Sequence, residues 1–145
     1  MRLLVFFFWP NLDAGSDRIS KRIRTFREEN DLPHVYFFKN LPSEDFLRPI
    51  NRARCVIGNS SVGICERSYL GVPVVNIGTR QHGRERGPNV IDVVSSSDAI
   101  IAALERDLSG EPMPRARLYG DGQAGERIAA VLATCELSIE KRLTY

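Results

Sequence analysis

The 145 residues suffice for one domain, large enough to bury roughly two thirds of its unfolded surface. Apolar residues make up 43% of the chain and charged residues 26%, the proportions of an ordinary soluble globular protein. The net charge of +2 is small, and the arginines are spread along the chain. The sequence therefore lacks the basic tracts typical of nucleic-acid-binding proteins.

The chain opens with an apolar run, Leu3–Trp9, that resembles the core of a signal peptide. It is short, lacks a small-residue cleavage site and ends in the turn signal Pro10-Asn11, so we predict a buried strand. No stretch has the roughly 20 apolar residues of a membrane helix, and we expect no membrane association. The three cysteines have no paired spacing, which favours reduced thiols and a cytoplasmic protein over disulfides or a metal site.

After this strand the pattern alternates between helices and apolar strands. A helix is expected at 16–29, with Ser16 as its N-cap, and another ends near Leu70, with Gly71 just past its end. The helix that ends near Leu70 begins after 59–61. The remaining helices are expected from residue 43, at 97–108 with a cap at Ser97 or Asp98, and at 122–134; the remaining strands are expected at 34–38, 55–58, 72–77 and 89–94. This alternation predicts an α/β fold, a Rossmann-like parallel sheet with helices on both faces, over residues 1–134. Residues 135–145 are expected to form a tail.

In such folds ligands bind beyond the carboxyl ends of the strands. The loops that follow the first four strands are the segments with the most polar residues that could serve a ligand, and they lie at 10–16, 39–41, 59–61 and 78–84. Helix N-termini at such an edge offer N–H groups and a positive dipole end. The sequence therefore predicts an anion site there, with a nucleotide diphosphate as its occupant.

The start of the helix after residue 59 carries two serines with two interpretations. Ser60 and Ser61 either cap the helix or donate to phosphate oxygens. Glu66 lies about 7 Å further along, at 1.5 Å rise per residue, near the span from a diphosphate to ribose hydroxyls. The alternative interpretation is that Glu66 is an ordinary solvated carboxylate.

The loop after 72–77 is rich in arginine and glycine. Arg80, Arg84 and Arg86 could clamp a phosphate bidentately or simply be solvated. His82 has no identifiable partner for acid–base work. The sequence contains no nucleophile with its base, no facing carboxylates and no metal-ligand cluster, so we expect a binding site without a catalytic set and without a cofactor.

Several blocks occur in an order that is specific to one family: Trp9–Ser16, Leu41–Phe46, Ile57–Glu66, Pro73–Arg84 and Tyr119–Ala124. The chain resembles the C-terminal half of UDP-N-acetylglucosamine 2-epimerases, in particular the hydrolysing enzymes that make N-acetylmannosamine for sialic acid-type sugars. The resemblance implies the C-terminal domain of a two-domain fold like that of GT-B glycosyltransferases, with UDP seated mainly on this domain.

By position, the resemblance implies the following contacts with the nucleotide. Ser60 and Ser61 would contact the diphosphate, Glu66 the ribose hydroxyls, and Arg80 would help to hold UDP. Asn11 would lie beside the nucleotide sugar, and the backbone at Leu41 would contact the uracil.

The family's N-terminal domain, which holds the acidic catalytic residues, has no counterpart in the 145 residues. We therefore expect a fragment that binds UDP or UDP-N-acetylglucosamine weakly, turns over nothing alone and exposes surface that favours a homo-oligomer. A modified 2,4-diacetamido sugar is an alternative substrate. Two other functions stay open: half of a GT-B glycosyltransferase, and a non-catalytic sugar-nucleotide binding module.

Overall fold

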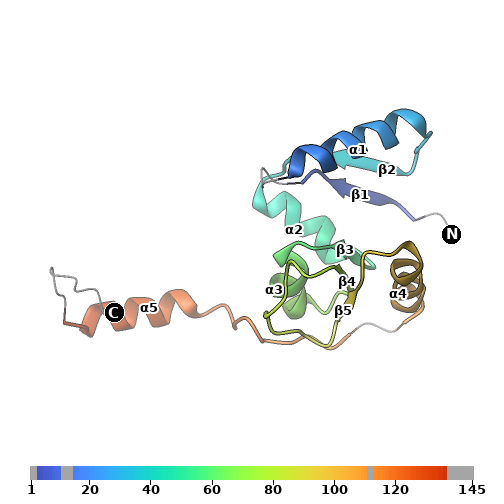
Figure 1. Cartoon of the computed structure of the whole chain (residues 1–145). Helices are drawn as coiled ribbons and strands as arrows, with labels where there is room; N and C mark the ends of the chain where they lie inside the picture. Colours follow the sequence, from blue (N-terminus) through green and yellow to red (C-terminus); the bar gives the residue numbers. More distant parts are fainter. Residues whose placement is uncertain (1–2, 11–14, 111–112, 137–145) are drawn as a thin grey trace, which may run out of the picture. The chain divides into compact units, whose positions relative to one another are not determined.

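The computed structural model describes residues 3–10, 15–110 and 113–136. Parallel strands alternate with helices along the chain, which confirms the predicted α/β, Rossmann-like class (Figure 1). The chain divides into two compact units, residues 1–50 and 51–145. None of the described helices is long and apolar enough to cross a membrane.

The N-terminal unit is built on one pair of parallel strands. It contains β1 (Val5–Phe8), α1 (Ser16–Glu29) and β2 (Val35–Phe38), and α2 (Ser43–Arg52) runs two residues past its end. The strands pair in register from Val5 opposite Val35 to Phe8 opposite Phe38. Phe8 stacks on Phe38 with ring centroids 5.5 Å apart and meets Phe46 of α2 edge to face at 4.9 Å. Aromatic packing thus holds α2 to the strands.

The prediction that the first strand is buried is wrong. Val5, Phe6 and Phe7 are 40%, 45% and 38% exposed. Because this sheet has only two strands, β1 has a hydrogen-bonding neighbour on one side only, and most of its side chains keep contact with solvent.

The N-cap of α1 also differs from its prediction, although the helix has the predicted bounds. Gly15, with φ 84°, is the N-cap, and Ser16 is the first helical residue. Glycine enters this left-handed conformation without steric cost, so the turn is made by backbone geometry instead of a side-chain cap. Asp17 in the first turn and Arg27 in the last suit the helix dipole.

The C-terminal unit holds a three-stranded parallel sheet, ordered β3 (Val56–Gly58), β4 (Val74–Ile77) and β5 (Val90–Val93). Two helices, α3 (Ser61–Leu70) and α4 (Ser97–Ser109), pack against it. Val74 and Val75 of the central strand are 2% and 0% exposed. Since consecutive strand residues point to opposite faces, β4 is covered on both faces.

The helices of this unit begin and end at local signals. Gly71 has φ 67° and donates its N–H to the Arg67 carbonyl at 2.9 Å, so the predicted C-terminal signal of α3 is confirmed. The cap of α4 is Ser96, one or two residues before the predicted alternatives, Ser97 and Asp98. The last helix, α5 (Ala124–Thr134), buries none of its residues.

Within the described residues, five strands form two sheets, β1–β2 and β3–β4–β5, where the sequence pattern had predicted one. Strand periodicity indicates that a strand is present, but its pairing partner depends on contacts between distant segments. The polar loops after β3 and β4 therefore lie at the edge of one sheet. The loops after β1 and β2 follow the strands of the other sheet.

Candidate functional site

The turn after β3 and the loop after β4 meet at one edge of the C-terminal unit. The two strands are parallel neighbours, with Gly58 opposite Asn76, so their carboxyl ends lie side by side. Arg80 Nη1 and Gln81 Nε2 both donate to the Asn59 carbonyl, at 3.2 and 2.8 Å. The prediction that these two segments come together is confirmed.

Ser60 occupies the cap position of α3 without acting as a side-chain cap. Its backbone is extended (φ −78°, ψ 144°), and its side chain makes no cap hydrogen bond. Its carbonyl accepts from the Gly63 N–H at 3.1 Å. Ser60 is exposed and Ser61 is half-buried, and neither hydroxyl bonds to another described side chain or backbone group. The capping interpretation therefore loses its main support, and both serines stand at the N-terminal end of α3.

Glu66 lies one and a half turns further along α3 and is exposed. Its neighbour Arg67 is wholly buried. Burial lowers the pKa of Arg67 to about 10, while the charge of Glu66 works in the opposite direction. Glu66 is thus a solvent-facing carboxylate on the helix whose first turn carries the two serines, a position that a ligand can reach.

The three arginines of the loop have three different surroundings. Arg80 contacts Asn59, and Arg84 Nη1 lies 3.5 Å from Cys65 Sγ of α3. Arg86 is turned inward, with its side chain 24% exposed. The sequence pattern had treated all three alike as phosphate clamps or solvated side chains.

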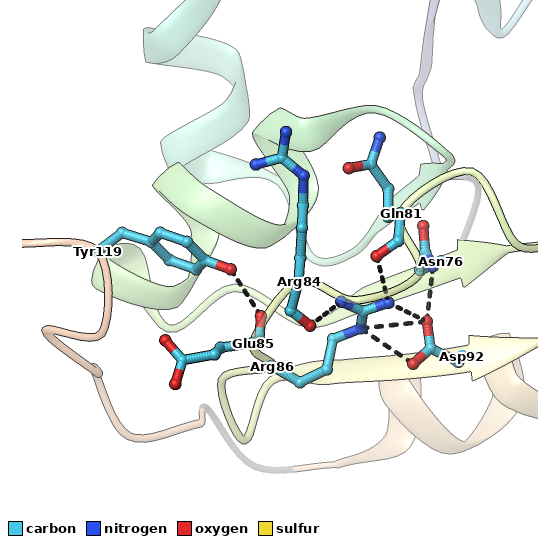
Figure 2. A network of polar contacts seen from close by, with 7 residues as sticks. All are labelled: Asn76, Gln81, Arg84, Glu85, Arg86, Asp92 and Tyr119. Carbon is cyan, nitrogen blue, oxygen red and sulfur yellow. Dashed lines mark hydrogen bonds and ion pairs between the residues drawn. The ribbon is translucent and has the colours of Figure 1, made fainter. Parts of the chain in front are cut away.

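Arg86 forms the centre of a polar network (Figure 2). Its Nε lies 3.0 Å from Asp92 Oδ2 of β5, and its Nη2 donates to the Gln81 carbonyl at 2.9 Å. Asn76 of β4 donates to Asp92 Oδ1 at 2.6 Å. Partial desolvation works to raise the pKa of Asp92, but the hydrogen bonds from Arg86 and Asn76 and the nearby positive charges bring that pKa below its usual value. The carboxylate is therefore held in its charged form.

Two further contacts hold the end of this loop. Tyr119 donates its hydroxyl to the Glu85 carbonyl at 2.7 Å (Figure 2). A Cβ built on Gly87 would overlap Ser68 Oγ of α3 and Asn89 Oδ1. Only glycine fits this close approach between loop and helix.

Two of the predicted site residues belong to the other unit. The Leu41 N–H donates to Asn40 Oδ1 at 3.0 Å, so a ligand contact there would use the Leu41 carbonyl. Asn11 lies outside the described residues. A groove of about 1030 Å³ in this unit is lined by Trp9, Pro10, Ser20, Arg24, Arg27, Glu28, Lys39 and Asn40.

The network side chains Asn76, Gln81 and Asp92 were not predicted as site residues. A signal for two of them exists: each is a polar residue within an apolar strand, and the register sets Asn76 directly opposite Asp92. Gln81 is 5% exposed, which its position in a polar loop does not suggest. Over the described residues, no group of three or more His, Cys, Asp or Glu side chains could hold a metal ion.

Comparison with known proteins gives one consistent result. The family model described as UDP-N-acetylglucosamine 2-epimerase matches residues 2–133. The chain is 38% identical over 128 residues to the UDP-N,N'-diacetylbacillosamine 2-epimerase (hydrolyzing) of Legionella pneumophila, a match over 88% of the chain and 33% of that protein. It is 28% identical over 140 residues to the UDP-N-acetylglucosamine 2-epimerase of Neisseria meningitidis, over 92% of the chain and 36% of the relative.

A third relative is the GDP/UDP-N,N'-diacetylbacillosamine 2-epimerase (hydrolyzing) of Campylobacter jejuni, 36% identical over 86 residues, 59% of the chain and 22% of the relative. The matches to these three proteins thus cover between about a fifth and a little over a third of each relative's length.

Proposed function

The chain belongs to the UDP-N-acetylglucosamine 2-epimerase family, and from that membership we propose that it is the UDP-binding part of a hydrolysing 2-epimerase. Such an enzyme converts UDP-N-acetylglucosamine and water to N-acetylmannosamine and UDP. The observation that carries the proposal is the pair of hydrogen bonds from Arg80 and Gln81 to the Asn59 carbonyl. They bring a cationic loop to the N-terminus of α3.

The diphosphate is assigned to this helix N-terminus. The first turn of an α-helix has N–H groups without partners in the helix and a positive dipole end, both of which favour an anion. The hydroxyls of Ser60 and Ser61 add two donors, and Arg80 adds a positive charge at the same edge. This set of donors suits phosphate oxygens better than a neutral ligand.

Glu66 is assigned to the ribose. A carboxylate accepts two hydrogen bonds from a vicinal diol. The separation along α3 from Ser61 to Glu66 is about 7 Å at 1.5 Å per residue, which matches the distance from a diphosphate to the ribose hydroxyls. The Leu41 backbone is assigned to the uracil and Asn11 to the region of the sugar, both by position in the family's motif blocks.

Turnover is assigned to residues beyond these 145. Removing the C2 proton of the sugar and assisting the loss of UDP require positioned acids and bases, and the matched relatives are about three times as long as the matched region. We therefore expect this chain to bind UDP and to release none from UDP-N-acetylglucosamine.

The sugar has two candidates. UDP-N-acetylglucosamine follows from the family, whereas a 2,4-diacetamido sugar nucleotide is favoured by the relatives at 38% and 36% identity, whose names specify N,N'-diacetylbacillosamine. Product analysis with both sugar nucleotides, on a protein that also contains the catalytic residues, would decide between them.

A UDP titration of this chain by calorimetry tests the proposal. We expect saturable binding, weakened at least about tenfold in Glu66→Ala and Arg80→Ala, since hydrogen bonds to charged groups contribute roughly 1.5–3 kcal/mol. Glu105→Ala and Arg106→Ala, which replace exposed side chains of α4, are the matched controls and should bind like the wild type. Absence of binding by the wild-type chain, or equal effects of all four substitutions, would refute the assignment.

A further inference from the structure

We propose that Arg86 is a positioning residue for the phosphate site. It holds the loop of residues 78–87, called the arginine loop below, in the conformation in which Arg80 and Gln81 reach the Asn59 carbonyl. The effect on ligand binding rests on the proposed function, while the effect on the loop does not.

The Arg86 guanidinium joins separate parts of the structure. It binds the Asp92 carboxylate through Nε and Nη2, the Gln81 carbonyl through Nη2 at 2.9 Å and the Arg84 carbonyl through Nη1. Two of these partners are backbone groups within the arginine loop, and the third is a side chain of β5 (Figure 2). The side chain therefore ties the middle of the loop to the sheet.

The sheet end of this tie is itself fixed. Asp92 accepts from Asn76 Nδ2 at 2.6 Å, and Asn76 is 1% exposed in the central strand. These two residues face each other in the β4–β5 register. The carboxylate consequently has little freedom to follow a moving loop.

The backbone of the arginine loop supplies little order by itself. Gly78 and Gly83 adopt left-handed conformations, with φ 75° and 80°, on either side of Arg80 and Gln81. The backbone hydrogen bonds described within the loop are short-range, from His82 N–H to the Thr79 carbonyl at 2.9 Å and from Arg84 N–H to the Gln81 carbonyl at 3.3 Å. An external tie is needed to select one conformation of such a segment.

The chemistry of the tie requires arginine. A guanidinium presents five N–H donors in a rigid fork and can bind a carboxylate and two carbonyls at once. A lysine ammonium at the same position could pair with Asp92 but could not span both carbonyls. Since the donors of Arg86 are used inside the protein, we assign Arg86 no direct contact with the phosphate.

The first test measures the loop. Amide hydrogen exchange followed by NMR is compared among the wild-type chain, Arg86→Gln, Arg86→Lys and the control Arg106→Gln, which removes the same charge from an exposed site on α4. We expect the His82 and Arg84 amides to exchange at least tenfold faster in Arg86→Gln, with amides of β4 unchanged, and Arg86→Lys to recover part of the protection. Unchanged loop amides, or an equal acceleration throughout the unit, would overturn the proposal.

The second test measures coupling to the ligand. UDP affinity is determined for Arg86→Gln, Arg80→Ala and the double variant. We expect Arg86→Gln to weaken UDP binding roughly tenfold. If Arg86 acts through Arg80, this weakening disappears in the Arg80→Ala background, whereas two independent losses of binding free energy would add. Additive effects would overturn the positioning role. If the wild-type chain does not bind UDP, the proposed function fails, and the exchange data alone decide whether Arg86 holds the loop.

Discussion

Gln81 lies 22 residues after Asn59, and its side-chain amide donates to the Asn59 carbonyl at 2.8 Å. The donor comes from the loop after β4, and the acceptor comes from the turn that leads into α3. Gln81 is 5% exposed, so the donor of this hydrogen bond is buried, whereas Asn59 is exposed. The bond sets the distance between the arginine loop and the two serines, and its loss should separate them.

Gln81→Met tests this bond with a side chain of similar volume. The substitution removes the hydrogen bond to Asn59, which lowers the unfolding free energy. It also removes an amide oxygen, Oε1, that is buried without a partner in the described residues, which offsets part of this loss. We therefore expect a net loss of at most about 1 kcal/mol in unfolding free energy. Gln81→Glu instead places a carboxylate against a carbonyl and should cost about 2 kcal/mol or more. Urea unfolding ranks the two variants, and both should weaken UDP binding. Wild-type UDP affinity in Gln81→Met would show that this bond does not organise the site.

Gly87→Ala should open the same loop from its other end. The added Cβ would overlap Ser68 Oγ and Asn89 Oδ1, both on buried residues, so we expect a loss of about 1–3 kcal/mol in unfolding free energy. Gly125→Ala is the matched control, because a Cβ there has no neighbour within 4 Å and a helical alanine is favoured by about 0.5–1 kcal/mol. Thermal unfolding measures both variants, and equal shifts would contradict the close packing at Gly87.

Asp92 gives the stability of the loop a defined pH dependence. Desolvation opposes its ionisation, but the bonds from Arg86 and Asn76 prevail and lower its pKa in the folded state. A group with a depressed folded-state pKa stabilises the protein above its unfolded pKa, about 3.9 for Asp, and this contribution is lost as the pH falls through the folded value.

Asp92→Asn should therefore lower the free energy of unfolding at pH 7, by roughly 0.5–1 kcal/mol because the Asp92 side chain is half exposed and screened. The difference from the wild type should shrink below about pH 4, as denaturant titrations at several pH values would reveal. A difference that stays constant down to pH 3 would mean that the charge of Asp92 does not support the loop.

Much of the local structure could be predicted from the sequence, because its signals lie within a few residues. The bounds of α1 at Ser16 and Glu29 and the end of α3 at Gly71 follow from spacing and from glycine. The division of the strands into two sheets could not be predicted. An apolar run such as Val5–Phe8 has the same pattern whether two or five strands pair around it.

The candidate site divides in the same way. Two segments after parallel strands had to meet at one edge, and the bonds from Arg80 and Gln81 to Asn59 confirm it. The separate surroundings of Arg80, Arg84 and Arg86 could not be predicted, since all three have the same side chain in one short loop. Whether a guanidinium turns inward depends on a carboxylate within its reach, and Asp92 belongs to the following strand.

Asp107→Asn should stabilise the chain at neutral pH. The Asp107 side chain is 2% exposed near the C-terminal end of α4, where a negative charge also opposes the helix dipole. Burial raises the pKa of this carboxyl, against the nearby charge of Arg106. A group with a raised folded-state pKa contributes stability that is present below its unfolded pKa and lost as the pH rises through the folded value.

The gain from Asp107→Asn should thus be about 1 kcal/mol at pH 7 and vanish towards pH 4, as denaturant unfolding at both pH values would measure. Asp98→Asn, in the first turn of the same helix, is the control and should cost a few tenths of a kcal/mol at pH 7. A loss of stability in Asp107→Asn at pH 7 would show that the carboxylate has a stabilising role.

Ser60→Ala separates the two interpretations of the serine before α3. A serine that caps a helix through its side chain typically contributes about 1 kcal/mol, but Ser60 makes no such bond, so the unfolding free energy should change by less than about 0.5 kcal/mol. If the hydroxyl donates to a phosphate, UDP affinity should fall about tenfold at the same time. Ser96→Ala replaces the residue at the same position of α4, also without a side-chain cap bond, and should change neither quantity. Paired denaturant and calorimetric titrations measure both effects. Lower stability with unchanged UDP affinity would show that Ser60 caps the helix and does not bind the ligand. The diphosphate contacts would then come from Ser61, Arg80 and the helix N-terminus.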